Sequence, residues 1–439
     1  MNWFQPALDL LQRLPSESDA RLHRFFSTER PVSIARAPGR LDVMGGIADY
    51  SGARVLELPL ACATFALVQA QDTPRCEVAS LRGDRWDFFA TGLPWFRDAK
   101  ADRWARYVVG VVQALLPTGP ATSGLRILIH SSVPEGRGVA SSAALEVAVA
   151  TAAAASLGNR IDPADLAALC QRVENHVVGA PCGIMDQMTS ACGKQDRLLR
   201  LLCQPGTIEG YDAIPAGFRF YGIDSGVSHA VSGADYGTVR TAAFMGQRII
   251  TAETAWRGDY LADLTPEEFA ELGRCLPEEM SGAEFLARYR GITDTATVVL
   301  PERRYPVRRA AQHAVDEQDR VDRFAQLLGE LSQRPSVATE IGRLMYGSHA
   351  SYGACGLGSD ATDRLVELVK ALGPERGLFG AKITGGGSGG TVAVFGRSDA
   401  ENVVREIAAL YGAETGRETR VFTESGPGAA ATGVLELRT

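Results

Sequence analysis

Two adjacent serines, Ser141 and Ser142, follow a turn that carries Pro134, Gly136 and Gly138. Glycines let a backbone fold tightly around a ligand and present its N–H groups to it. Apolar runs predict a strand before the turn and a helix after it, and the positive end of such a helix favours a phosphate. The serine hydroxyls could bind a metal or a phosphate oxygen. Because no lysine follows the second glycine, this is not a Walker A loop, and an ordinary strand–turn–helix junction explains the stretch equally well.

Three carboxylates and an arginine form a second set of candidates. Asp186 lies in a turn punctuated by glycine and proline, which places an acid in an apolar neighbourhood. Glu174 lies beside the apolar face of the helix predicted before that turn, and a solvated surface acid is the alternative interpretation. Arg40 and Asp49 lie in another turn-rich stretch near the N-terminus. These residue types suit proton transfer, metal binding and charge stabilisation.

A glycine run near the C-terminus matches G-x-G-x-x-G at Gly385, Gly387 and Gly390. A predicted strand follows the run, whereas a dinucleotide-binding fold needs a helix there. The run therefore favours close approach of the backbone to a ligand or to a neighbouring loop.

The patterns around these candidates predict an α/β (α+β) chain in which helices and strands alternate. Asp162 followed by Pro163 is a strong helix start, because aspartate caps the first turn and proline suits its first position. Residues 246–300 show helical pieces and charges but no pattern that indicates chemistry. The other expected helices cover residues 17–28, 102–116, 139–157, 237 onward, 305–328, 336–352 and 360–372. The expected strands cover residues 32–35, 54–68, 75–89, 125–129, 221–225 and 391–395.

Composition narrows the class of protein. The chain has 439 residues, enough for two or three domains, with 45% hydrophobic and 22% charged residues. The net charge of −7 and the lack of a long basic run argue against a nucleic-acid partner. No signal pattern or membrane-spanning stretch is expected, since the alanine-rich run 139–157 reads as a buried helix. Eight cysteines without a C-x-x-C pair indicate free thiols in a reducing cytoplasm.

Three stretches together carry a resemblance to a known family. Residues 38–40, 134–143 and 382–390 resemble, in this order, the three motifs of the GHMP small-molecule kinases. Within that superfamily the chain is similar to the galactokinase branch and, more closely, to the L-arabinokinases. The motifs shared with the galactokinase branch are residues 104–108, 145–148, 181–187 and Tyr236. Those shared with the L-arabinokinases are residues 41–52, 233–237 and 284–289.

The resemblance implies a two-domain GHMP kinase fold with the active site in the cleft between residues 1–215 and 216–439. It also implies ATP, Mg²⁺ and phosphoryl transfer to the anomeric hydroxyl of L-arabinose. A monomer or small homo-oligomer is expected, with the sugar and ATP as its partners and with neither nucleic acid nor membrane bound.

The resemblance also implies a role for each candidate residue. Asp186 would be the base on the attacking hydroxyl, and Arg40 would keep it ionised and stabilise the transferring phosphoryl group. Glu174 and Ser142, in preference to Ser141, would hold Mg²⁺. The implied ATP contacts are Gly136, Gly138, Ala140, Ser141, Ser142 and Trp104, of which Trp104 also fits a core position. The implied sugar contacts are Asp49, Gly46, Ile47, Gly183 and Tyr236.

The chain departs from the galactokinase pattern at Gly46 and Ile47, where galactokinases carry Glu-His. L-Arabinose lacks the C6 hydroxymethyl group of D-galactose, so the departure favours L-arabinose and predicts that Gly46→Glu narrows the preference. Galactokinase is the first alternative. D-Glucuronate ranks last, because no Arg or Lys lies near Gly46 to meet its carboxylate. A non-catalytic sugar sensor is disfavoured, because base and metal ligands are all retained.

Overall fold

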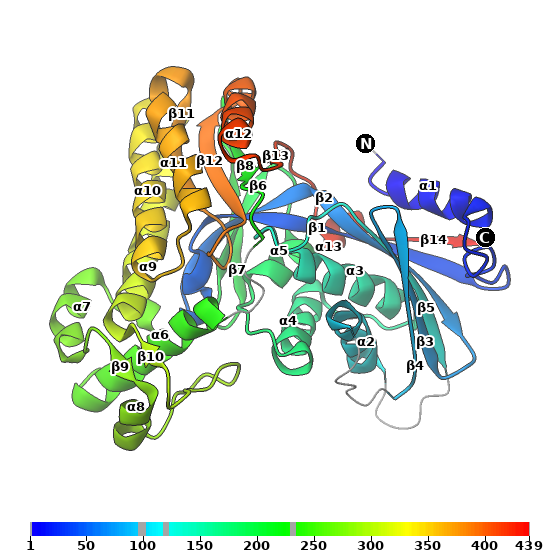
Figure 1. Ribbon diagram of the computed structural model, residues 1–439, viewed down its shortest axis with the longest axis horizontal. Helices are drawn as coiled ribbons and strands as arrows, with labels where there is room; N and C mark the ends of the chain where they lie inside the picture. The colour runs from blue at the N-terminus through cyan, green and yellow to red at the C-terminus, as the bar shows by residue number, and fades with distance from the viewer. Residues whose placement is uncertain (1, 95–101, 117–122, 229–233, 439) are drawn as a thin grey trace.

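The structure, a computed structural model, describes residues 2–94, 102–116, 123–228 and 234–438. It has two domains with mixed helices and sheets, one on each side of Figure 1. The N-terminal domain is built on one large sheet, in which β1 and β2 are its long central strands. Among the described strands of this sheet, β3 and β5 are the pair that runs parallel. The strands of this sheet are β1 Pro31–Met44, β2 Arg54–Gln71, β3 Arg75–Arg82, β4 Arg85–Gly92, β5 Gly124–Ser131, β6 Arg197–Leu202, β7 Thr207–Ala213 and β14 Val434–Arg438.

Two hydrophobic clusters cover the faces of this sheet. The alternation of β5 shows why: Ile127 and Ile129 pack in one cluster and Leu128 in the other, as the two-residue period of a strand requires. Helix α1, Gln5–Arg13, lies on the Leu128 face. The helices on the opposite face are α2 Arg103–Leu115, α3 Ser141–Ser156, α4 Pro163–Val173, α5 Met185–Cys192 and the short α13 Ala429–Thr432. These helices carry the candidate residues Trp104, Ser141, Ser142 and Asp186.

The C-terminal domain has a four-stranded antiparallel sheet in the order β11-β12-β8-β13. Helices α9 and α10 cover one of its faces and α11 and α12 the other. Helices α6, α7 and α8, with the small hairpin β9–β10, form a separate cluster below this sheet in Figure 1. The strands are β8 Phe218–Asp224, β9 Met280–Ser281, β10 Arg304–Tyr305, β11 Leu378–Ile383, β12 Thr391–Arg397 and β13 Arg420–Phe422. The helices are α6 Ala234–Glu253, α7 Pro266–Leu272, α8 Gly282–Tyr289, α9 Val307–Glu330, α10 Ala338–Ala354, α11 Asp360–Leu372 and α12 Glu401–Thr415.

The predicted fold class is confirmed, but three elements differ from their predictions. The strand expected over 75–89 is two strands, β3 and β4, which pair antiparallel across a turn at Gly83. Residues 17–28 form turns rather than a helix, because the Asp19 carboxylate accepts the backbone N–H of Arg21 and fixes a turn there. The strand predicted at 32–35 continues to Met44 through a stretch that reads as a turn. A register shift against β2 between Pro38 and Arg40 accommodates the proline and glycine.

The end of the chain returns to the N-terminal sheet. Strand β14 pairs antiparallel with β1, with Val32 opposite Leu437. The division at 215/216 stays a prediction, and the structure adds that the last strand belongs to the sheet of the first domain.

Two further features concern the whole chain. All eight cysteines are unpaired, as predicted. Within the described residues, no helix combines the length and the apolar character needed to cross a membrane.

Candidate functional site

A cavity of about 940 Å³ opens between the two domains. Its wall is formed mainly by the N-terminal domain, while Tyr236 of α6 and Gly386 of the glycine run close it from the C-terminal domain. Twelve of the predicted site residues line it. They are Arg40, Asp49, Trp104, Gly136, Gly138, Ala140, Ser141, Ser142, Glu174, Gly183, Asp186 and Tyr236.

The loop before α3 has the backbone conformation that its glycines allow. Gly136 and Gly138 adopt φ angles of 67° and 70°. Ala140 also lies in the left-handed region, which a residue with a Cβ rarely adopts and which tends to persist at functional sites. No side chain caps α3 within the described residues, so its first N–H groups point from a positive helix end toward the cavity wall. The loop can therefore bind an anion.

The C-terminal glycine run packs directly on this loop, which decides between the two interpretations of the run. A Cβ at Gly385 would lie 3.0 Å from the carbonyl oxygen of Gly138, and one at Gly390 would lie 2.8 Å from that of Arg137. The Thr391 hydroxyl donates to the same Arg137 carbonyl at 2.8 Å. The run thus lets the second domain's backbone approach the loop of the first.

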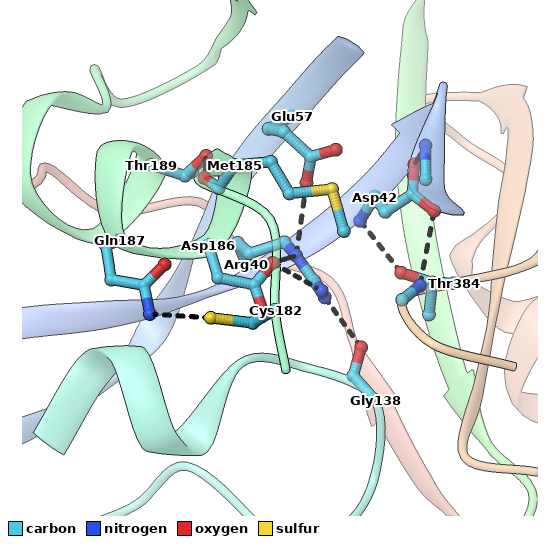
Figure 2. A network of polar contacts seen from close by, with 12 residues as sticks. Arg40, Asp42, Glu57, Gly138, Cys182, Met185, Asp186, Gln187, Thr189 and Thr384 are labelled. Atoms are coloured by element: carbon cyan, nitrogen blue, oxygen red, sulfur yellow. Dashed lines mark hydrogen bonds and ion pairs between the residues drawn. The ribbon is translucent and has the colours of Figure 1, made fainter. Parts of the chain in front are cut away.

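Arg40 and Asp186 form a salt bridge on the cavity wall. The Arg40 Nη2 and Nε atoms lie 2.7 and 2.9 Å from Asp186 Oδ1, and Nη1 donates to the Gly138 carbonyl at 2.7 Å. Figure 2 shows Arg40 between Asp186, Gly138 and a second acid, Glu57. Burial alone would lower the pKa of the guanidinium, but Asp186 and Glu57 raise it above its ordinary value. Arg40 is therefore a fixed positive charge beside an ionisable carboxylate that reaches the cavity.

Glu57 is a site residue that the sequence analysis missed. Its carboxylate is fully buried and lies 3.2 Å from Arg40 Nε. Burial raises the pKa of Glu57 well above its usual range, and the nearby Asp42 raises it further, against the effect of Arg40. Its position as a lone acid in the apolar strand run 55–60 is the signal that could have identified it.

Glu174 is buried, contrary to the surface interpretation. It accepts hydrogen bonds from Tyr107 at 3.2 Å and from Gln187 at 2.7 Å. The Ser142 hydroxyl also donates to it. Burial and the charge of Asp186 raise the pKa of Glu174 to about 7, although these donors lower it. The acid is thus oriented at the cavity beside the anion-binding loop.

The chemistry of this corner fits a divalent cation. A second buried acid, Glu146, lies across Gln187 from Glu174, and its Oε1 has no partner within the described residues. The described part of the chain contains no cluster of three His, Cys, Asp or Glu side chains suited to a metal. Mg²⁺ commonly uses one or two protein ligands together with waters and substrate phosphates, so Glu174 and Ser142 suffice for that mode.

Asp49, Gly183 and Tyr236 meet at the other end of the cavity wall. A Cβ at Gly183 would lie 1.6 Å from Asp49 Oδ2, so only glycine fits there. Asp49 is 2% exposed, and its Oδ1 has no hydrogen-bond partner within the described residues. Burial raises the pKa of Asp49 to about 7. An unsatisfied carboxylate oxygen in a cavity wall is suited to accept a hydrogen bond from a ligand hydroxyl.

Gly46 and Ile47 depart from the prediction. Neither lines the cavity, and Ile47 is buried among apolar residues of the C-terminal domain. A Cβ at Gly46 would lie 1.8 Å from the hydroxyl oxygen of Tyr352, and φ there is +44°. The predicted sugar contacts of these two residues are therefore corrected: Tyr352 fills the space beside Gly46, and its hydroxyl donates to the Gly385 carbonyl at 3.0 Å and accepts the N–H of Ile47 at 2.9 Å.

A buried ion pair, also missed, joins the domains behind the cavity. Lys382 Nζ of β11 lies 2.7 Å from Asp42 Oδ2 of β1, and both side chains are fully buried. The backbone N–H of Asp42 donates to the Thr384 hydroxyl at 2.8 Å, as Figure 2 shows. Gly385 donates to the same aspartate at 3.2 Å. This network fixes the start of the glycine run against β1.

Comparison with known proteins assigns the family. Two family models match this chain. The model of the GHMP kinases N terminal domain matches residues 106–194, and the model of the GHMP kinases C terminal matches residues 330–413. A galactokinase of Chloroflexus aggregans is 32% identical over 91% of this chain and 92% of its own length. The chain belongs to the GHMP kinases.

This GHMP kinase is also similar to two further proteins. An L-arabinokinase of Arabidopsis thaliana is 39% identical over 94% of the chain. The chain spans about half of that relative, 47% of its length. The crystal structure of Lactococcus lactis galactokinase complexed with galactose covers 98% of this chain, all of its own chain aligning, with a TM-score of 0.78 at 20% identity. That likeness confirms the two-domain GHMP kinase fold.

Proposed function

We propose that this GHMP kinase is a sugar kinase that transfers the γ-phosphoryl group of ATP to the anomeric hydroxyl of L-arabinose. The observation that carries the proposal is the Arg40–Asp186 pair on the wall of one cavity with the loop before α3. Phosphoryl transfer needs an oriented acceptor hydroxyl and compensation of charge on the phosphoryl oxygens, and this wall offers a group for each.

In the proposed reaction Asp186 accepts the proton of the anomeric hydroxyl as its oxygen attacks the γ-phosphorus. Arg40 keeps Asp186 ionised in the ground state and stabilises negative charge that develops on the phosphoryl oxygens. The N–H groups of the loop from Gly136 to Ser142 bind the other phosphates, and Trp104 borders the adenine. Mg²⁺, held by Glu174 and Ser142, would supply charge neutralisation between the phosphates.

The sugar's ring hydroxyls would meet Asp49, Gly183 and Tyr236. L-Arabinopyranose shares the ring stereochemistry of D-galactose but has no C6 hydroxymethyl group. Position 46 carries no acid, and its space is taken by Tyr352, so residue 46 cannot reach a C6 hydroxyl. A hydrogen bond to a charged group contributes about 1.5–3 kcal/mol, and its absence for galactose corresponds to roughly 10- to 150-fold in kcat/KM.

The similarity to the Arabidopsis thaliana L-arabinokinase supports this substrate. Galactokinase remains the second candidate, favoured by the relative that this chain matches over nearly its whole length. Because its eight cysteines are unpaired, we propose a reducing cytoplasm as its compartment.

The test is ATP consumption with a panel of pentoses, hexoses and uronic acids. We expect turnover with L-arabinose at a higher kcat/KM than with D-galactose, and none with D-glucuronate. Equal or better kcat/KM with D-galactose would favour galactokinase. Sugar binding without any ATP consumption would favour the non-catalytic sensor.

A further inference from the structure

Arg240, on the second turn of α6, is a buried arginine that the proposed reaction does not use. It is 6% exposed and does not belong to the described residues that line the cavity. Its Nη1 donates to the carbonyl of Cys182 at 2.8 Å. Cys182 directly precedes Gly183, so this bond fixes the turn that also carries Asp186. The guanidinium lies 5.4 Å from the centroid of the Tyr50 ring.

Asp294 fixes the guanidinium from the other side. Arg240 Nε and Nη2 each donate to one Asp294 oxygen at 2.8 Å, a bidentate geometry. Asp294 also accepts the Thr297 hydroxyl at 2.6 Å and the Ala296 N–H at 3.1 Å. Asp294 lies in the segment 246–300, for which the sequence indicated no chemistry. Both side chains are nearly buried, with 8% of the Arg240 side chain and 5% of the Asp294 side chain exposed.

The charge of Arg240 acts on Asp49. Burial raises the pKa of Asp49 to about 7, and Arg240 is the strongest opposing influence that lowers it. Without Arg240, burial and the neighbouring Asp186 would raise the pKa further. A protonated Asp49 presents a hydroxyl where the sugar needs an acceptor.

We propose that Arg240, clamped by Asp294, is a positioning residue of the sugar subsite that keeps Asp49 an ionised hydrogen-bond acceptor and fixes the turn 182–183 opposite it. The inference rests on the proposed function and gives the segment 246–300 a role in it. Through Asp294, this segment sets the orientation of a charge behind the sugar without touching the sugar.

Several other groups face Asp49 and contribute to its titration. The charged ones are Asp186 from α5 and Arg40 from β1. The phenols and thiols that face it are Tyr50, Tyr236, Tyr352 and Cys203. None of these phenols or the thiol carries a positive charge, and of the two arginines Arg240 lowers the pKa of Asp49 more than Arg40 does. Arg240 is thus the group whose removal changes the Asp49 charge balance most.

The test is the pH dependence of L-arabinose binding in the absence of ATP, measured by titration calorimetry on the whole chain. For the unmodified protein, affinity should fall as the pH drops through about 7, where Asp49 becomes protonated. In Arg240→Met this fall should move to higher pH. An opposite charge typically shifts a carboxyl pKa by about 1–3 units, so the Kd at neutral pH should rise on the order of tenfold or more and recover in alkaline buffer.

Three variants separate this role from a structural one. Asp294→Asn keeps the shape of the clamp but removes its negative charge, so Arg240 acts on Asp49 without compensation and the fall in affinity should move to lower pH, opposite to Arg240→Met. Arg240→Lys retains the charge and should keep the profile near that of the unmodified protein. Arg304→Met removes an exposed arginine just beyond this segment, in β10, paired with Glu279 at 3.2 Å, and should change nothing.

The KM for ATP should stay unchanged in all of them. If the unmodified chain binds L-arabinose and folded Arg240→Met and Asp294→Asn keep its pH profile, the inference is wrong and the proposed function stands. The inference is also wrong if the variants bind L-arabinose more weakly by the same factor at every pH, or if their affinity for ATP falls by the same factor. If the unmodified chain neither binds nor phosphorylates L-arabinose, the proposed function itself is wrong.

Discussion

At the scale of single residues, Asp186 is the group on which the proposed reaction depends. Its carboxylate is partly exposed to the cavity, while its partner Arg40 is buried and also lies beside Glu57. Asp186→Asn is nearly isosteric and leaves Arg40 with one carboxylate neighbour. The variant should therefore fold, while loss of a positioned base costs on the order of 10²–10⁴-fold in kcat.

Single-turnover kinetics with L-arabinose, together with a thermal melt, check this expectation. A folded Asp186→Asn protein with near-normal turnover would remove Asp186 from the mechanism. A loss of the melting transition would instead show that the Arg40 pair stabilises the fold.

Glu174 should set the metal requirement. Chelator should abolish activity and Mg²⁺ restore it, and Glu174→Gln should raise the Mg²⁺ concentration for half-maximal rate by at least about tenfold, since even residues behind a ligand change metal affinity by 10–100-fold. Glu146→Gln is the matched control. Burial raises the pKa of Glu146 well above its usual range, and an amide of the same shape can still pack beside Gln187 there. An equal effect in both variants would contradict the assignment.

The sequence identified those site residues that lie within a recognisable short motif. Asp186 lies within a short motif, and so does Arg40. Arg240 has no such signal, because its partners Cys182 and Asp294 are 58 and 54 positions away and meet it only in the folded chain. The role of Gly46 was misassigned for a related reason: a motif position shows which side chain is missing but not what fills its space.

At the scale of elements, β1 is the strand on which both halves of the site depend. It carries Arg40 toward the cavity and Asp42 toward the second domain, two positions apart and therefore on one face. The sequence showed turn residues at 36–44, and the strand could not be predicted there because pairing with β2 outweighs local propensity.

The turn after β1 leads to a prediction that replaces the expected effect of Gly46→Glu. Any side chain at 46 meets the Tyr352 hydroxyl, so Gly46→Glu should destabilise the protein rather than change its sugar preference. Gly46→Ala should lower the free energy of unfolding by more than Gly158→Ala, which also has positive φ but nothing within 4 Å. The left-handed strain common to both is about 1–2 kcal/mol, and overpacking adds roughly 1–3 kcal/mol at Gly46.

Urea unfolding of the two single variants and of Gly46→Ala in a Tyr352→Phe background measures these terms. Removing the hydroxyl oxygen should reduce the cost of Gly46→Ala, a coupling that a double-mutant cycle detects. Additive costs would show that Tyr352 does not restrict position 46.

At the scale of the whole molecule, the cleft lies where the two sheets meet, and a shared hydrophobic cluster together with specific polar contacts joins the domains there. The loop before α3, from the first domain, and the glycine run, from the second, touch backbone to backbone at Gly138 and Gly390. The two-domain arrangement could be predicted from the order of the motifs. The buried Lys382–Asp42 ion pair between the domains could not be predicted, since the two residues are 340 positions apart.

The Lys382–Asp42 ion pair leads to the last prediction. Both side chains are fully buried, so Lys382→Met leaves the Asp42 carboxylate without its cation. Removing one partner of a buried pair costs about 3–5 kcal/mol, whereas replacing both partners costs much less. Lys382→Met should therefore lower the urea midpoint strongly, and Asp42→Asn with Lys382→Met should recover part of the loss.

Lys370→Met is the matched control, because Lys370 is exposed and its contact with the Tyr346 ring, 5.6 Å from the centroid, is weak. Since Asp42 also accepts the N–H of Gly385, the single variant should release the glycine run from β1 and reduce kcat along with stability. A midpoint shift no larger than that of Lys370→Met would show that hydrophobic contact between the domains, and not this ion pair, fixes the cleft.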